Sequence, residues 1–167
     1  MIFPADHVAK AEAVLDAARA RGLMVATAES CTGGLVAACL TEIAGSSAVV
    51  ERGFVSYTNQ SKIELLGVRA DLIETLGAVS EEVARAMAEG ALARSHAQVA
   101  VSITGVAGPG GGTVRKPVGL VHFGLAVEGR DTRARVERFG AQGRAHVRLA
   151  ALGVALDLLL TGVTGED

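Results

Sequence analysis

A serine at the end of an apolar run is the first residue of this sequence whose setting suggests chemistry. Ser30 lies in the octapeptide TAESCTGG, residues 27–34, between apolar runs at 23–26 and 35–40. Small hydroxyl residues and two glycines between a strand and a helix leave backbone N–H groups free, at a place where the helix dipole favours negative charge. Such a turn can hold a phosphate, or the oxyanion that forms when a hydroxyl attacks a carbonyl. Ser30 is therefore the candidate nucleophile.

The candidate substrate-binding residues in this turn are Thr32, Gly33 and Gly34.

The same turn also has a purely structural interpretation. Serine and threonine before a helix are ordinary N-caps, and glycine is common in turns. Cys31, directly after Ser30, could act as a thiol nucleophile, although free cysteines are more often buried core residues. The octapeptide alone leaves these alternatives open.

A lysine further along the chain is the candidate base. The chain has three lysines among its 16 basic residues, so arginine is its usual cation. Unlike arginine, a lysine in a dry pocket can have a pKa low enough for its amine to accept a proton. Lys62 follows the only tyrosine, Tyr57, by five residues, and a Ser-Lys pair would activate Ser30 without a histidine. A solvated lysine at a helix start is the alternative interpretation, and a Ser-His-acid triad formed in space stays open too.

The elements that must position these residues follow from the hydrophobic pattern. Helices are predicted over 6–20, 35–40, 58–67, 71–76, 80–96 and 144–160, and strands over 23–26, 48–57, 99–104, 118–127 and 132–139, with a bulge at Gly53. This alternation predicts an α/β protein, a three-layer α/β/α sandwich with a mixed, mostly parallel sheet. Ligands bind beyond the carboxyl ends of strands in such sheets, which is where Ser30, Tyr57 and Thr104 lie.

Length and composition limit the classes of function. At 167 residues the chain is expected to form a single domain over 1–167. Its net charge of -2 provides no general attraction for nucleic acid or anionic lipid. The N-terminus does not resemble a signal peptide, and no uncharged stretch is long enough to span a bilayer, so a cytoplasmic location is expected. The two cysteines form no metal-binding motif, and no metal or cofactor is predicted.

A glycine-rich segment follows the strand predicted over 99–104. Residues 105–113 read GVAGPGGGT, which is neither a Walker A motif nor a dinucleotide fingerprint, because no Gly-Lys-Ser/Thr follows and no helix begins there. Its structural interpretation is a flexible connection.

Several long, separated motifs resemble the C-terminal domain family of CinA, the nicotinamide-nucleotide amidase (PncC-type) proteins. The runs that carry this resemblance are TAESCTGGLVAACLTEIAGSSAVVERGFVSYTNQSK, GAVSEEVARAMAEGA, VAVSITGVAGPGGGTVRKPVG and GRAHVRLAALGVAL. The resemblance implies a compact α/β/α domain that self-associates as a homodimer or higher homo-oligomer. It also implies hydrolysis of the carboxamide of nicotinamide mononucleotide to nicotinate mononucleotide and ammonia. The larger N-terminal domain of full-length CinA is not part of this sequence.

The resemblance also assigns roles to individual residues. The family nucleophile corresponds to Ser30, its base to Lys62 and its active-site tyrosine to Tyr57. The family Thr-Gly turn corresponds to Thr104 and Gly105, and its arginine to Arg144, although Gly143 replaces the acidic residue that often precedes that arginine.

These roles make up a mechanistic hypothesis. Lys62 takes the proton of Ser30, and backbone N–H groups near Thr32 and Gly33 hold the oxyanion. Tyr57 orients Lys62 or relays a proton, and Arg144 or the loop at 108–113 holds the phosphate. A non-catalytic nucleotide-binding or partner-binding module of the competence-associated type is the alternative.

Overall fold

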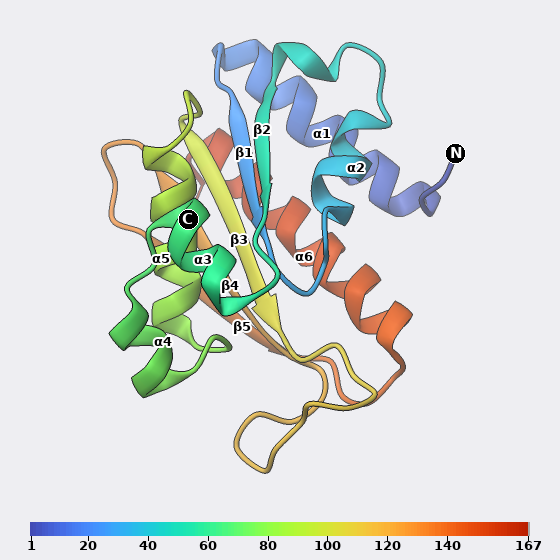
Figure 1. The fold of residues 1–167 in the computed structure, drawn as a ribbon. Coiled ribbons are helices and arrows are strands. Elements are labelled where there is room, and N and C mark those ends of the chain that lie inside the picture. The colour runs from blue at the N-terminus through green and yellow to red at the C-terminus, as the bar shows by residue number, and fades with distance from the viewer. Residues whose placement is uncertain (167) are drawn as a thin grey trace.

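Five strands form one mixed sheet in the order β2-β1-β3-β4-β5 in the computed structural model, which describes residues 1–166 (Figure 1). The strands are β1 (Val25–Glu29), β2 (Val50–Val55), β3 (Val99–Gly105), β4 (Leu120–Val127) and β5 (Arg133–Arg138). β1 pairs in parallel with β2 and β3, whereas β4 is antiparallel to both β3 and β5. Only β4 therefore runs against the other strands, which confirms the prediction of a mixed, mostly parallel sheet.

Helices cover both faces of the sheet. The helices are α1 (Ala5–Arg21), α2 (Leu35–Thr41), α3 (Asn59–Leu66), α4 (Ala70–Leu76), α5 (Glu81–Ala93) and α6 (Arg144–Thr164), with a short 3-10 turn η1 at Ser46–Ala48. Figure 1 shows α1, α2 and α6 on one face and α3, α4 and α5 on the other. This arrangement confirms the predicted α/β/α sandwich.

The alternation of side chains along β3 separates two hydrophobic cores. Val99, Val101 and Ile103 pack toward α1 and α6, while Ala100 packs toward α5. α5 also approaches β4 closely at Gly124, where an added Cβ would lie 2.4 Å from the carbonyl oxygen of Ala84. The sheet therefore carries a thick core on one face and a tightly packed helix on the other.

Two predicted details of the strands were wrong. The first strand lies at Val25–Glu29, not at 23–26, because its ladder with β3 continues through the polar residues Thr27 and Glu29. The irregularity in β2 is not at Gly53, because Val25 pairs with Val50 and Ala26 with Arg52. Gly53 instead avoids a clash, since an added Cβ there would lie 2.8 Å from the hydroxyl oxygen of Thr27. The longer β1 places Ser30 directly after the last residue of the strand.

Helix α6 is the one helix of residues 1–166 that is long and apolar enough to cross a membrane by length and composition. Half of its most apolar stretch is buried, and the helix packs against α1, β3 and β4. It therefore has the contacts of a core helix.

Candidate active site

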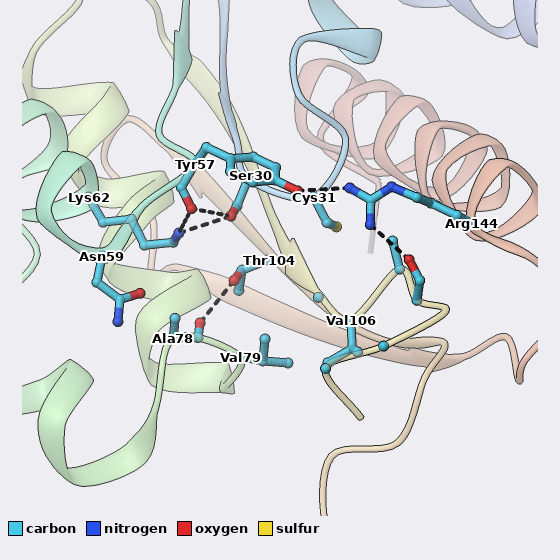
Figure 2. A pocket seen from close by; sticks show the side chains of 15 residues that line it. Ser30, Cys31, Tyr57, Asn59, Lys62, Ala78, Val79, Thr104, Val106 and Arg144 are labelled. Atoms are coloured by element: carbon cyan, nitrogen blue, oxygen red, sulfur yellow. Dashed lines mark hydrogen bonds between the residues drawn. The ribbon is translucent and has the colours of Figure 1, made fainter. Parts of the chain in front are cut away.

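A cavity of about 320 Å³ opens at the carboxyl ends of β1, β2 and β3 (Figure 2). Nine residues were predicted to form the site, and six of them line this cavity: Ser30, Tyr57, Lys62, Thr104, Gly105 and Arg144. The three that do not line it are Thr32, Gly33 and Gly34. The structure therefore brings together residues that are up to 114 positions apart in the chain, from Ser30 to Arg144.

Lys62 is buried against Ser30. Thr58 caps α3 by accepting a hydrogen bond from the backbone N–H of Ser61, which places Lys62 in the first turn of the helix. Its side chain is 1% exposed, and its Nζ lies 2.9 Å from the Oγ of Ser30. Burial lowers the pKa of Lys62 from its usual value. The interpretation of Lys62 as a solvated helix-start lysine is therefore wrong.

The other two partners of the Lys62 amine are backbone carbonyls. Nζ donates to the oxygen of Ser56 at 3.0 Å and to that of Tyr57 at 3.1 Å. A carbonyl oxygen can only accept a hydrogen bond, whereas the Ser30 hydroxyl can also donate one. A neutral amine has two N–H groups and one lone pair, so it can donate to both carbonyls and accept from Ser30. These contacts accommodate both the ammonium, which would donate to all three oxygens, and the neutral amine that a general base needs; burial favours the neutral form.

Ser30 itself begins a tight turn between β1 and α2. Its backbone N–H donates to the carbonyl of Ile103 at 2.9 Å, and its carbonyl accepts from the N–H of Gly33 at 3.0 Å. The first bond ties the turn to the end of β3. The second closes the turn, so that the side chain of Ser30 faces the cavity (Figure 2).

A buried carboxylate occupies the start of α2, which sequence analysis expected to be free for an anion. Glu29 is 1% exposed and accepts from the hydroxyl of Thr32 at 2.7 Å. It also accepts from the backbone N–H groups of Val36 and Ala37 at 2.9 and 3.1 Å. The N-terminus of α2 attracts negative charge, as expected. The charge that it binds is the carboxylate of Glu29, from the protein itself. The prediction of free N–H groups at the start of this helix is therefore wrong for Val36 and Ala37.

Arg148 holds the same turn from α6. Its Nε donates to the carbonyl of Cys31 at 3.1 Å and its Nη2 to the carbonyl of Thr32 at 3.2 Å. Sequence reasoning missed both Glu29 and Arg148. Glu29 was within the octapeptide that drew attention to the site, and Arg148 lies four residues after Arg144, a spacing that places both on one helix face.

Tyr57 faces Arg144 rather than Lys62. Nη2 of Arg144 donates to the Tyr57 hydroxyl at 2.8 Å, and its Nη1 donates to the carbonyl of Gly108 at 2.8 Å (Figure 2). Only the main-chain carbonyl of Tyr57 contacts the amine of Lys62. Arg144 forms no ion pair with an acidic residue in the described part of the chain, so its charge is available to a ligand.

Thr104 and Gly105 form the floor of the cavity at the end of β3. The Thr104 hydroxyl donates to the carbonyl of Ala78 at 2.9 Å, which ties the strand to the segment before α5. An added Cβ at Gly105 would lie 2.7 Å from a methyl group of Val121, so glycine is needed for this close approach.

Cys31 lines the cavity but is poorly suited to nucleophilic attack. Burial raises the pKa of its thiol to about 11, which keeps the thiol protonated at neutral pH. This favours the interpretation of Cys31 as a buried packing residue. Within residues 1–166, no group of three His, Cys, Asp or Glu side chains is arranged to hold a metal ion.

A serine hydroxyl next to a buried lysine, on an α/β/α scaffold, is an arrangement typical of hydrolases that work without a histidine. The chain belongs to the CinA C-terminal domain family, which matches residues 7–163. It is 50% identical to the nicotinamide-nucleotide amidohydrolase PncC of Enterobacter agglomerans, over 86% of this chain and 87% of that protein.

Other relatives share the fold and, in part, the length. The chain superimposes with a TM-score of 0.95 on the competence/damage inducible protein CihA from Agrobacterium tumefaciens, at 50% identity over 96% of this chain and 98% of the other. A CinA-like protein from Mycolicibacterium vanbaalenii is 55% identical over 86% of this chain but only 34% of its own length. The chain thus spans about a third of such CinA-like relatives.

Proposed function

We propose that this protein, acting as a single domain, hydrolyses the carboxamide of nicotinamide mononucleotide to nicotinate mononucleotide and ammonia, through an acyl-serine intermediate. The relationship to an amidohydrolase supports the enzyme class, a hydrolase acting on an amide. The observation that carries the mechanism is the contact of 2.9 Å between the Lys62 amine and the Ser30 hydroxyl. The amine is buried there among oxygen atoms that carry no formal charge.

Ser30 and Lys62 divide the proposed reaction between them. Neutral Lys62 takes the proton of Ser30 while the Ser30 oxygen attacks the amide carbon, which gives a tetrahedral oxyanion. The protonated amine then returns that proton to the amide nitrogen as the C–N bond breaks and ammonia leaves. A water molecule attacks the acyl-serine while Lys62 accepts its proton, and the protonated amine then passes this proton to the Ser30 oxygen as the acyl–oxygen bond breaks. The product acid leaves and ionises in solution. Lys62 thus acts as base and acid in turn.

Arg144 is the proposed phosphate ligand. Among the described residues its two hydrogen bonds go to uncharged oxygens, those of Tyr57 and Gly108, and leave its other N–H groups free. Gly110 and Gly111 line the cavity next to it, so the loop at 108–113 offers backbone N–H groups close to the same cation. The predicted phosphate site therefore lies between Arg144 and this loop.

An assay of ammonia release from nicotinamide mononucleotide tests the proposal. We expect turnover by the wild-type protein and weaker turnover of nicotinamide riboside, which lacks the phosphate. Ser30→Ala should abolish turnover. The matched control is Ser47→Ala, which removes an exposed serine outside the cavity and should leave the rate unchanged. Ammonia release by Ser30→Ala at the wild-type rate would reject the acyl-serine route.

A binding module without turnover is the alternative, because related structures carry competence-related names. The burial of Lys62 argues against it, since binding alone does not require an amine without a counterion next to a serine. No turnover of any amide by folded protein would favour the alternative. Self-association stays a prediction of the resemblance, and a cytoplasmic location stays a prediction of the sequence pattern.

A further inference from the structure

We infer that Arg148 is a positioning residue, which orients the backbone of the Ser30 turn so that the N–H groups of Cys31 and Thr32 form the oxyanion hole. This inference rests on the proposed acyl-serine reaction. It assigns a function to an arginine that does not line the cavity.

The contacts of Arg148 show that it does not serve to pair charges. Its guanidinium donates to two neutral carbonyls, those of Cys31 and Thr32, and no acidic residue of the described chain forms an ion pair with it. Its side chain is half-buried, so part of its hydration is lost. Holding a cation on uncharged oxygens has an energetic cost, which a geometric requirement of the turn would explain.

Peptide geometry links these carbonyls to the neighbouring N–H groups. The peptide bond is planar and trans, so the N–H of Thr32 points away from the Cys31 carbonyl that Arg148 binds. By the same rule the N–H of Cys31 points away from the Ser30 carbonyl, which accepts from Gly33. Both N–H groups therefore have a defined direction.

These two N–H groups also lack partners. In the turn, the N–H of Ser30 donates to Ile103 and that of Gly33 donates to Ser30. The N–H groups of Cys31 and Thr32 have no acceptor within residues 1–166. Both residues are buried, and of the two Cys31 lines the cavity while Thr32 adjoins it in the chain. Buried backbone donors without a partner are rare, and a position next to a nucleophile suits donors meant for a transient oxyanion.

The charge of Arg148 strengthens the Thr32 donor, whose N–H belongs to the same peptide group as the Cys31 carbonyl. A cation on a carbonyl oxygen polarises the peptide group, so its N–H becomes a better donor in a poorly hydrated site. Glu29 holds the opposite side of the turn through the Thr32 hydroxyl. The peptide between Cys31 and Thr32 is therefore held between two charged side chains of opposite sign.

The test compares Arg148→Met and Arg148→Lys with the wild-type protein. The control is Arg52→Met, because Arg52 also donates to a backbone carbonyl, that of Arg94 at 3.0 Å, but its other partner is Glu51 and not the Ser30 turn. Two rates are measured: kcat for nicotinamide mononucleotide, and covalent modification of Ser30 by a fluorophosphonate probe, followed by mass spectrometry. The second reaction needs the nucleophile and the oxyanion hole but no nicotinamide substrate.

We expect Arg148→Met to lower kcat by roughly 100-fold, the effect of losing one oxyanion donor, with KM unchanged. Probe modification should slow in parallel, Arg148→Lys should be intermediate, and added ethylguanidinium should partly restore the Met variant. The pH profile should keep its midpoint, because Arg148 does not touch Lys62. Arg52→Met should behave as wild type.

Wild-type values of kcat and of probe modification in folded Arg148→Met would overturn the inference. If that variant does not fold, wild-type rates in Arg148→Lys would overturn it instead. Probe modification of wild-type Ser30 without turnover would reject the proposed substrate and still leave Arg148 testable. No modification and no turnover in the wild type would reject both.

Discussion

The Lys62 amine and the Ser30 hydroxyl lie 2.9 Å apart in a pocket where the amine has two carbonyl oxygens as its other partners. Within residues 1–166 no carboxylate pairs with it, so the protein bears the cost of burying this amine in its charged form. That cost falls when the amine is neutral, which is the form that can accept a proton from Ser30.

Replacing Lys62 should separate its charge from its basicity. Lys62→Arg keeps a cation that cannot act as a base, and Lys62→Met keeps the apolar stem alone. Both variants should lose turnover by about 10²–10⁴-fold, the usual contribution of a general base. Ammonia release measures the rate, and circular dichroism checks the fold. Near-normal turnover in Lys62→Arg would mean that the lysine only neutralises an anion.

The pH profile should show the lowered pKa of Lys62. Because the base is active only when neutral, kcat/KM should rise with pH and level off at a pH below 10.5, the ordinary value for lysine. The measurement is the initial rate of ammonia release across the pH range in which the protein stays folded. A rate that rises only around the ordinary lysine pKa would contradict the neutral-amine mechanism.

Stability should depend on pH through the same group. Between the lowered pKa of folded Lys62 and 10.5, the unfolded chain binds more protons at this site, so the free energy of unfolding rises with pH. Below the lowered pKa the folded protein carries the full cost of the buried charge. Urea unfolding of the wild type and Lys62→Met, at neutral pH and at about pH 9, isolates this contribution. At neutral pH the free energy of unfolding of Lys62→Met should exceed that of the wild type, and the difference between the two proteins should shrink at the higher pH. A difference that stays constant would refute the lowered pKa of Lys62.

Glu29 should be needed for the stability of the turn. In Glu29→Gln an amide NH₂ replaces one of the oxygens that accept from Thr32, Val36 and Ala37, so a buried donor faces another donor. We expect a loss of about 1–3 kcal/mol in the free energy of unfolding, together with slower turnover. Urea unfolding measures the first effect. Glu12→Gln, at an exposed position of α1, is the control and should change neither quantity.

Tyr57 should affect substrate binding more than the chemical step. Tyr57→Phe removes the hydroxyl that accepts from Arg144 but keeps the main-chain carbonyl that accepts from Lys62. KM for nicotinamide mononucleotide should rise by up to about 10-fold, the value of one hydrogen bond, while kcat changes little. Steady-state kinetics measure both constants. A large fall in kcat at constant KM would instead show that the phenol takes part in proton transfer.

Local patterns predicted the elements and singled out Ser30 and Lys62, because these depend on short-range features of the sequence, whereas the contact between the two residues is made by the fold. Hydrophobic runs and caps identified the strands and helices, and the scarcity of lysine drew attention to Lys62. The full length of β1 was missed because Thr27 and Glu29 interrupt its apolar pattern, although the ladder with β3 holds them in the strand.

Side chains that act on distant backbone groups could not be predicted in this way. Arg148 lies on a helix with a wide apolar stripe, and its targets, Cys31 and Thr32, are more than a hundred residues earlier in the chain. A backbone carbonyl carries no signature in the sequence, so nothing marks it as the partner of an arginine. Glu29 was overlooked for a similar reason, since two of its partners are backbone N–H groups of α2.

Helices on both faces of the sheet contribute side chains to the surroundings of Ser30. Lys62 comes from α3 on one face and Arg148 from α6 on the other, so the reaction centre exists only when both helical layers are docked. Activity should therefore disappear as soon as either layer detaches, even while the rest of the chain keeps its secondary structure. Two fragments cut in the exposed loop around Val114 would each be inactive, and turnover would return only on their reassembly.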